Sequence, residues 1–183
     1  MRIIPGKWRG RKIKPPESNN TRPTGDRVKE SCFSIIGQDV ENATVLDLFA
    51  GTGNLGLEAL SRGANTATFV EKSSKALSVV RSNVDALAAT EDCTLIKMDA
   101  LTFIKKSPVK KTFDLVFLDP PYLKIDISFI FSELANSIHI LENALIVLEH
   151  PTKQTFEPKT NALVQTDSRR YGDTSLTFYR KEK

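Results

Sequence analysis

The sequence predicts an α/β protein with a doubly wound, mainly parallel, seven-stranded sheet that follows a basic N-terminal extension. Three observations predict it: short apolar segments alternate with segments of helical periodicity, a glycine-rich turn follows the first apolar segment, and positive charge concentrates near the N-terminus. The chain has 183 residues, of which 40% are hydrophobic, enough for one domain with a substantial core. We therefore divide it into an arm, residues 1–23, and a domain, residues 24–183.

The strands and helices are predicted from periodicity and from residues that end each element. Five parallel strands and a closing antiparallel pair are expected at Thr44–Phe49, Thr66–Val70, Thr94–Lys97, Phe113–Leu118, Ala144–Glu149, Leu163–Asp167 and Ser175–Arg180. Helices are expected from a Thr24 cap to Ile36, at Asn54–Arg62, Ser73–Ala88 and Ala100–Lys106, and within Ile127–Ile140. In such sheets ligands bind beyond the carboxyl ends of the strands, so the residues that follow each strand are the candidates for function.

A glycine-rich turn follows the first predicted strand. Gly51, Gly53 and Gly56 satisfy the G-x-G-x-x-G pattern, in which glycines permit a tight turn and close approach of the backbone to a ligand. Glu71 ends the second strand 20 residues after Gly51, where a carboxylate can accept both ribose hydroxyls of an adenosine. The strand, the turn, the helix and Glu71 together predict an adenosine-containing cofactor.

Two carboxylates favour S-adenosylmethionine over NAD as that cofactor. Asp47 lies four residues before Gly51, where its charge would repel a pyrophosphate but would attract an ammonium and a sulfonium. Asp99 follows the third strand and can accept a hydrogen bond from the adenine amino group. Ala50, which precedes Gly51, and Ala100, which follows Asp99, also belong to the predicted cofactor site.

The fourth strand ends in the tetrad Asp119-Pro120-Pro121-Tyr122. An exocyclic amino group on a base is a poor nucleophile, so its methylation needs acceptors for the two N–H groups. The Asp119 carboxylate and the Pro120 carbonyl offer two acceptors, and the prolines stiffen the loop that holds them. Tyr122 offers a flat face on which an extruded base can stack. The tetrad therefore predicts methyl transfer to an amino group of a base.

The arm carries the strongest local excess of charge. Residues 1–25 contain seven Lys or Arg against one carboxylate, a net charge of +6, which leaves −2 for the remaining chain. Such a concentration predicts a polyanion-binding surface, and Ile3, Ile4, Trp8 and Ile13 suggest an ordered hairpin rather than a frayed tail. The arm residues that we predict to bind RNA are Arg2, Lys7, Arg9, Arg11, Lys12 and Lys14.

The cysteines and the hydropathy of the chain indicate which metal sites and cellular compartments to expect. Cys32 and Cys93 have no close Cys or His neighbour, so we expect neither a disulfide framework nor a zinc site. We also expect no membrane span, because no apolar run approaches about 20 residues, and no secretory signal, because the basic N-terminus lacks an apolar core. A cytoplasmic monomer is the expectation. His139 and His150 are interpreted as structural.

With these motifs in view, the sequence resembles the bacterial small-subunit ribosomal RNA guanine-N2 methyltransferases, commonly called RsmD. The resemblance covers nearly the whole chain and rests on four segments: residues 22–30 (RPTGDRVKE), residues 47–64 with the glycine turn, residues 116–122 (VFLDPPY) and residues 171–174 (YGDT). The tetrad alone is shared with DNA adenine-N6 methyltransferases and other amino methyltransferases. Its combination with residues 22–30 is more specific.

The resemblance implies a class I, Rossmann-like methyltransferase fold and transfer of one methyl group to N2 of a guanine in 16S ribosomal RNA, presented by an assembled small subunit. It implies that Asp47, Gly51 and Gly53 line the methionine end of S-adenosylmethionine. Arg22 and Thr24 would close over the cofactor from the N-terminal side.

Three alternatives stay open at the level of sequence. A DNA adenine-N6 methyltransferase would share the tetrad, although the chain is short for a separate target-recognition domain. An NAD-binding oxidoreductase would use the same glycines, but Asp47 argues against it. A non-catalytic RNA-binding protein would not need residues 119–122 intact.

Overall fold

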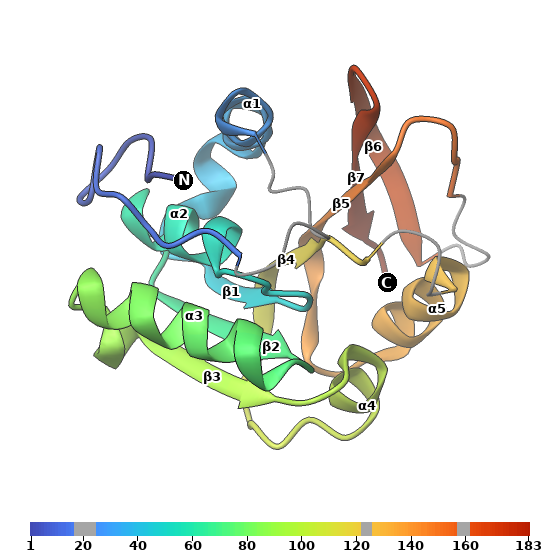
Figure 1. Cartoon of the computed structure of the whole chain (residues 1–183). Helices are drawn as coiled ribbons and strands as arrows, with labels where there is room; N and C mark the ends of the chain where they lie inside the picture. Colours follow the sequence, from blue (N-terminus) through green and yellow to red (C-terminus); the bar gives the residue numbers. More distant parts are fainter. Residues whose placement is uncertain (17–24, 122–125, 157–161) are drawn as a thin grey trace.

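The computed structural model describes residues 1–16, 25–121, 126–156 and 162–183, which form a seven-stranded sheet in the order β3-β2-β1-β4-β5-β7-β6 (Figure 1). Strands β1 to β5 are parallel to one another, whereas β7 is antiparallel to β5 and to β6. The strands are β1 Thr44–Asp47, β2 Thr66–Glu71, β3 Cys93–Lys97, β4 Phe113–Leu118, β5 Ile140–Pro151, β6 Leu163–Tyr171 and β7 Thr174–Lys181. The predicted fold class is confirmed.

Two hydrophobic clusters lie on the two faces of this sheet. One joins the N-terminal hairpin, α1 (Asp26–Ile36), α2 (Asn54–Ser61) and α3 (Ser74–Ala86) to strand residues such as Val45. The other joins α4 (Ala100–Lys105) and α5 (Ile127–Asn136) to alternate strand residues such as Leu46. Both faces are covered, as expected of a parallel sheet whose strands read as continuous apolar runs. Two short 3₁₀ helices complete the described elements: η1 (Gly37–Val40) follows α1, and η2 (Thr90–Asp92) follows α3. None of the described helices is long and apolar enough to cross a membrane.

The structure differs from the sequence prediction at the ends of several elements, among them α1, β5, β6 and β7. Helix α1 has Gly25 at its N-cap position, where the sequence predicted Thr24, a residue outside the described part of the chain. Helix α5 lies within its predicted range and ends at Asn136, where Ser137 takes an extended backbone conformation. Strand β5 begins at Ile140, which pairs with Phe113, rather than at the predicted Ala144. The final two strands are longer than predicted, since they pair as far as the turn at Gly172, whose φ is +63°.

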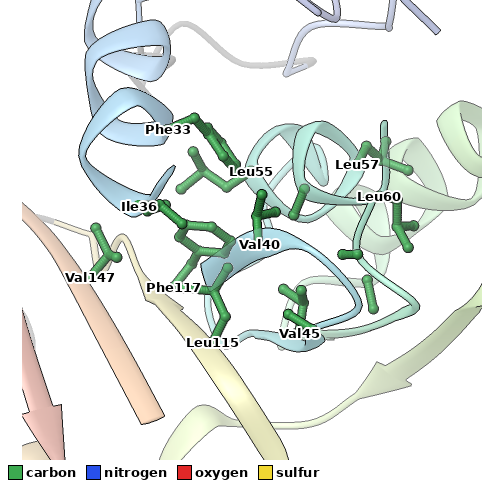
Figure 2. Packing of buried hydrophobic residues seen from close by; sticks show 14 of the residues in the cluster. Phe33, Ile36, Val40, Val45, Leu55, Leu57, Leu60, Leu115, Phe117 and Val147 are labelled. Atoms are coloured by element: carbon green, nitrogen blue, oxygen red, sulfur yellow. The ribbon is translucent and has the colours of Figure 1, made fainter. Parts of the chain in front are cut away.

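Helix α1 packs directly over strand β4. The rings of Phe33 and Phe117 lie with centroids 5.6 Å apart, and both side chains are buried. Figure 2 shows Ile36 and Val147 beside this pair, with Val40 on the α2 side of it. The contact fixes α1 above the strand that leads to Asp119.

The arm forms the predicted hairpin over residues 1–14. Arg2 and Lys12 form an antiparallel bridge, and the amide of Ile3 donates to the Arg11 carbonyl at 2.9 Å. Ile3 and Ile13 are buried in the same cluster as α1, α2 and α3. The hairpin is therefore packed into the main core through its isoleucines, with its basic side chains outside.

The turn of the hairpin fits closely against the end of α2. Gly6 has a φ of +87°, and a Cβ atom there would lie 1.7 Å from the Ser61 carbonyl oxygen, so only glycine fits. The Lys7 amide donates to that carbonyl at 2.8 Å, and the Ser61 hydroxyl donates to the Pro5 carbonyl at 2.7 Å. These contacts fix the hairpin relative to α2.

A buried ion pair connects the hairpin, α1 and α2. The Lys29 ammonium lies 2.8 Å from the Glu58 carboxylate, and neither side chain is exposed to solvent. Lys29 also donates to the Arg2 carbonyl and to the Asn54 side-chain oxygen, each at 2.7 Å. Glu58 accepts in turn from the Ile4 amide at 3.0 Å and from the Arg62 guanidinium at 3.1 Å. Burial lowers the pKa of Lys29, while Glu58 opposes that shift.

We predict that Glu58→Gln lowers the free energy of unfolding by about 3–5 kcal/mol, because it leaves the buried Lys29 charge without its counterion. Asp26→Asn is the matched control, since it breaks the exposed Arg2–Asp26 pair and should cost about 1 kcal/mol or less. Urea denaturation of both variants measures the difference. Equal stabilities of the two variants would show that the buried pair does not fix the hairpin and helices.

Candidate functional site

The candidate site lies where the strand order reverses between β1 and β4. In the sheet, β1 is followed on one side by β2 and β3 and on the other by β4 and β5, so connections leave in opposite directions from this point. Asp47, the last residue of β1, pairs with Phe117 of β4, which places Asp119 two residues beyond that register. Ligands of open α/β sheets bind at this kind of crevice.

The glycine turn has the backbone geometry that its sequence predicted. Gly51 and Gly53 have φ values of +54° and +77°, a region that disfavours other residues. The Gly53 amide donates to the Ala50 carbonyl at 2.6 Å, and the Ala50 amide donates to the Val70 carbonyl at 3.2 Å, which ties the turn to β2. The loop is thus held in one shape before any ligand binds.

Gly56 allows α2 to approach the sheet. A Cβ atom there would lie 2.4 Å from the Phe69 ring of β2 and 3.3 Å from an Asp47 carboxylate oxygen. Because there is no side chain at this position, the Gly56 amide comes within 3.2 Å of that same oxygen and donates to it. The third glycine therefore positions both the helix and Asp47.

The Glu71 carboxylate, at the end of β2, accepts hydrogen bonds from the glycine turn that follows β1 and from the loop that follows β2. One carboxylate oxygen accepts from the Gly51 amide at 3.0 Å and the other accepts from the Ser73 amide at 2.7 Å. A carboxylate offers about four acceptor positions. Glu71 consequently has capacity left to accept two hydroxyl groups.

Asp47 is a buried carboxylate, 2% exposed. Burial raises the pKa of Asp47 to about 7, with a further upward effect from Glu71, while the Gly56 amide opposes the shift. No cationic side chain forms an ion pair with Asp47 among the residues that the structure describes. A cationic ligand beside it would compensate its charge.

Asp99 and Ala100 lie at the start of α4. One oxygen of Asp99 accepts from the Leu101 and Thr102 amides at 3.1 and 3.3 Å, so Asp99 is the N-cap of the helix. The other oxygen lies 3.7 Å from the exposed Lys72 ammonium. The first amide of a helix has no intrahelical acceptor, which leaves the Ala100 N–H able to donate to a ligand.

Asp119, Pro120 and Pro121 follow β4, while Tyr122 lies outside the described residues. Asp119 is half-buried, and Pro120 is buried. Burial raises the pKa of Asp119 well above its usual value, and repulsion from Glu149 and Asp47 adds to the shift. The ends of β1, β4 and β5 thus bring three carboxylates together.

Sequence reasoning did not single out Glu149. It lies near the end of β5, is 4% exposed, and pairs in register with Leu176 of β7. A charged residue directly after the apolar run of residues 144–148, at the carboxyl end of a central strand, is the signal that could have identified it.

The predicted RNA-binding residues lie on the outer side of the hairpin. Three of them have partners: Arg2 pairs with Asp26, Lys7 lies 3.2 Å from Asp92, and Arg11 donates to the Ala86 carbonyl at 2.6 Å. The other three side chains are exposed, namely Arg9, Lys12 and Lys14.

The hairpin ends beside the glycine turn. Asn83 of α3 accepts from the Lys14 amide at 2.7 Å and donates to the Thr52 carbonyl at 2.9 Å, so one side chain joins the arm to the loop. Arg22 and Thr24, which the resemblance assigned to the cofactor, lie outside the described residues.

The side chains of His150, Cys32 and Cys93 pack in the interior of the protein or at its margin. His150 is buried, accepts or donates at 2.9 Å with the Thr177 hydroxyl, and has a pKa lowered by burial. Cys32 is buried in the core, and burial raises the pKa of Cys93 to about 12. Within residues 1–16, 25–121, 126–156 and 162–183, no group of three or more His, Cys, Asp or Glu side chains could hold a metal ion.

Comparison with known proteins agrees with this architecture. The family model "Conserved hypothetical protein 95" matches residues 1–180. The chain is 36% identical to "Putative rRNA methyltransferase YlbH" of Bacillus subtilis over 99% of both chains. It is 39% identical to "Ribosomal RNA small subunit methyltransferase D" of Haemophilus influenzae, covering 81% of this chain and 78% of that one. A solved structure, "Putative methyltransferase yhhF" from Escherichia coli, superimposes with a TM-score of 0.88 at 30% identity and covers 100% of this chain and 98% of that one.

The fold and the strand-end site define a class I, Rossmann-like methyltransferase. Within that class, the chain belongs to the RsmD family, as the motifs indicated.

We predict that Asp47→Asn stabilises the ligand-free protein at pH 8 by about 2–4 kcal/mol. Asp47 is protonated in the folded chain and ionised in the unfolded chain between its ordinary pKa of 3.8 and about 7, so wild-type stability falls as the pH rises through this window. One pKa unit corresponds to about 1.4 kcal/mol. Asparagine at position 47 still offers an oxygen that accepts from the Gly56 amide, and it carries no charge that burial would destabilise.

Urea denaturation at pH 5 and pH 8 measures this effect, because the folded Asp47 carboxyl is neutral at pH 5 and ionised at pH 8, whereas asparagine is neutral at both. The measured quantity is the difference in free energy of unfolding between Asp47→Asn and wild type. If this difference is the same at pH 8 as at pH 5, the Asp47 carboxyl does not titrate with a raised pKa.

Proposed function

We propose that the protein transfers a methyl group from S-adenosylmethionine to the exocyclic N2 amino group of a guanine in 16S ribosomal RNA. The observation that carries the proposal is the Asp119-Pro120 strand end beside the glycine turn, at the reversal of strand order. Membership of a family with relatives named as small-subunit ribosomal RNA methyltransferases supports the substrate. We further propose a monomer that acts in the cytoplasm on assembled small subunits.

The residues of the cofactor site fit S-adenosylmethionine. Bound there, it supplies a methyl group on a positively charged sulfur. The buried Asp47 carboxylate attracts the positive charges of the cofactor, and this attraction lowers the pKa of Asp47 toward the ionised form. Glu71 accepts the ribose hydroxyls with its remaining lone pairs, and Gly51 and Gly53 let the backbone approach the methionine end. Asp99 accepts a hydrogen bond from the adenine amino group, and the Ala100 N–H donates to the adenine.

Asp119 and Pro120 orient the amino group. The Asp119 carboxylate and the Pro120 carbonyl each accept one N–H, so that the nitrogen lone pair turns away from the ring and toward the methyl carbon. Because the nitrogen gains positive charge during transfer, its interaction with Asp119 strengthens in the transition state. The raised pKa of Asp119 suits it to receive the proton that the amino group must lose afterwards. Tyr122 stacks on the base.

The alternatives are less well supported. NAD would bring a pyrophosphate next to Asp47, a buried carboxylate that has no compensating cation among the described side chains. A DNA adenine-N6 methyltransferase would use the same strand end. Methyl transfer from labelled cofactor to naked ribosomal RNA, small subunits and DNA, with the modified base identified by mass, separates the substrates.

We predict that Asp119→Asn lowers the single-turnover rate of methylation by about 10²-fold or more, because a neutral amide replaces a preorganised charged acceptor. Small subunits from a strain lacking the modification serve as substrate, at saturating S-adenosylmethionine. Affinity for the cofactor should change little. Asp85→Asn, at an exposed position on α3, is the matched control and should react at the wild-type rate. A wild-type rate for Asp119→Asn would mean that residues 119–122 are only a turn.

We predict that the hairpin contacts the phosphate backbone through its exposed cations. Changing Arg9, Lys12 and Lys14 together to Gln should reduce the slope of log affinity against log salt by about 2–3 units, since three phosphate contacts are lost. These side chains point away from the core, so the free energy of unfolding and the affinity for S-adenosylmethionine should stay at wild-type values. RNA binding titrated over a series of salt concentrations measures the slope. An unchanged slope would remove the hairpin from the RNA surface.

A further inference from the structure

A second feature of the carboxyl edge is a groove of about 640 Å³ between α1 and the β6–β7 hairpin. In Figure 1, α1 and the tip of this hairpin stand on the same side of the molecule, with the end of β4 between them. The groove is lined by Arg27, Glu30, Ser31, Ser34 and Ile35 of α1 and by Arg169 and Tyr171 of β6.

The sheet register places this groove near the active strand end. Arg169 of β6 pairs with Leu176 of β7, and Leu176 pairs with Glu149 of β5. Glu149 directly follows Leu148, the partner of Leu118 in β4. Adjacent strands lie about 4.8 Å apart, so the backbone of Arg169 is about 14 Å from that of Asp119. A strand of RNA with one base at Asp119 would reach the groove within a few nucleotides.

The α1 wall of the groove is the outer face of the helix. Its lining residues recur at spacings of three, four and seven, opposite the buried face that carries Lys29, Phe33 and Ile36. Arg27 is exposed and has no ion-pair partner among the described residues. The packing of Phe33 on Phe117 fixes this wall relative to β4.

The β6 wall combines a guanidinium with a fixed aromatic ring. Arg169 is 59% exposed and lies 3.1 Å from Asp167 of the same strand, which orients it. Tyr171 is half-buried and packs against the same cluster as α1. Arg170, next along the strand, points to the opposite face and does not line the groove. This wall therefore presents the Arg169 guanidinium beside a partly buried ring.

We propose that this groove binds the single-stranded RNA that adjoins the target guanine, with Arg27 and Arg169 on its phosphates and Tyr171 against a base. The inference rests on the proposed function, since it extends that function's substrate from one base to its neighbours. Arginine on two facing walls, with one aromatic ring, matches the way proteins hold single-stranded RNA, by phosphate contact and stacking. Glu30 can accept from a base amino group.

The lining argues against other occupants. Interfaces between proteins have apolar, aromatic-rich centres, whereas only Ile35 and Tyr171 supply carbon-rich surface here, and the other five lining residues are charged residues or serines.

The test compares three proteins: wild type, the double variant Arg27→Gln with Arg169→Gln, and Lys110→Gln. Lys110 is an exposed cation before the amino end of β4, at the opposite edge of the sheet, and serves as the matched control. The probe is a fluorescein-labelled single-stranded 12-nucleotide RNA, titrated by anisotropy at several salt concentrations. A second double variant, Arg27→Lys with Arg169→Lys, keeps both charges.

We expect the Gln double variant to bind the RNA about 5–10-fold more weakly at low salt and to lose about 1–1.5 units of salt slope, since about 0.7 unit accompanies each phosphate on a single strand. The Lys double variant and Lys110→Gln should retain the wild-type slope. In methylation of small subunits, the Gln double variant should raise KM with little change in kcat, and its affinity for S-adenosylmethionine should equal that of wild type.

Wild-type RNA affinity and slope in the Gln double variant would overturn the proposal. If that variant instead methylates naked ribosomal RNA normally but assembled subunits poorly, with RNA binding unchanged, the groove docks a protein of the subunit. A changed sedimentation coefficient would assign it to a second copy of the chain. These outcomes are separate from the proposed function: a wild-type protein that binds RNA through the groove but methylates no guanine would refute only the latter.

Discussion

The buried pair of Lys29 and Glu58 is the constraint on which the arrangement around the site depends. Each charge is satisfied only when the hairpin, α1 and α2 are docked together. Lys29 lies on α1, Glu58 and Asn54 lie on α2, and the hairpin supplies the Arg2 carbonyl and the Ile4 amide. Desolvation makes such pairs a poor source of net stability, and an apolar replacement of similar shape can be more stable. We interpret the pair as a device that permits one docking and penalises others.

That docking determines where the chemistry can occur. With α2 held close to the sheet at Gly56, the amide of this residue reaches Asp47, and the glycine turn lies against β2. With α1 held over β4, the neighbouring strand ends bring Asp47, Asp119 and Glu149 together. Burial, with repulsion from neighbouring carboxylates, raises the pKa values of Asp47 and Asp119. A cationic cofactor beside them would favour their ionised forms, whereas the same electrostatics disfavour a dinucleotide pyrophosphate.

The sequence predicted the strands and the residues that follow β1, β2 and β4, because apolar runs bounded by glycine, proline and carboxylates are local signals. It did not predict that β5 begins at Ile140, since Leu141 to Asn143 mix apolar and polar residues and their pairing depends on a distant partner, Phe113. Glu149 and Lys29 were missed for a related reason: burial of a charge is decided by tertiary packing. A helical stripe in which Lys29 shares a face with Phe33 and Ile36 was nevertheless visible.

The two basic surfaces of the protein are built from elements that also form its core. The hairpin buries Ile3 and Ile13 while exposing Arg9 and Lys12, and α1 buries Phe33 while presenting Arg27 on its other face. Each element thus has one face that specifies its position and another that presents cations to solvent. Since the same packing that positions Asp119 also positions these cations, the distances between them and Asp119 are set by the fold itself. In the proposed function, the protein selects its RNA through this fixed spacing of charges around one crevice.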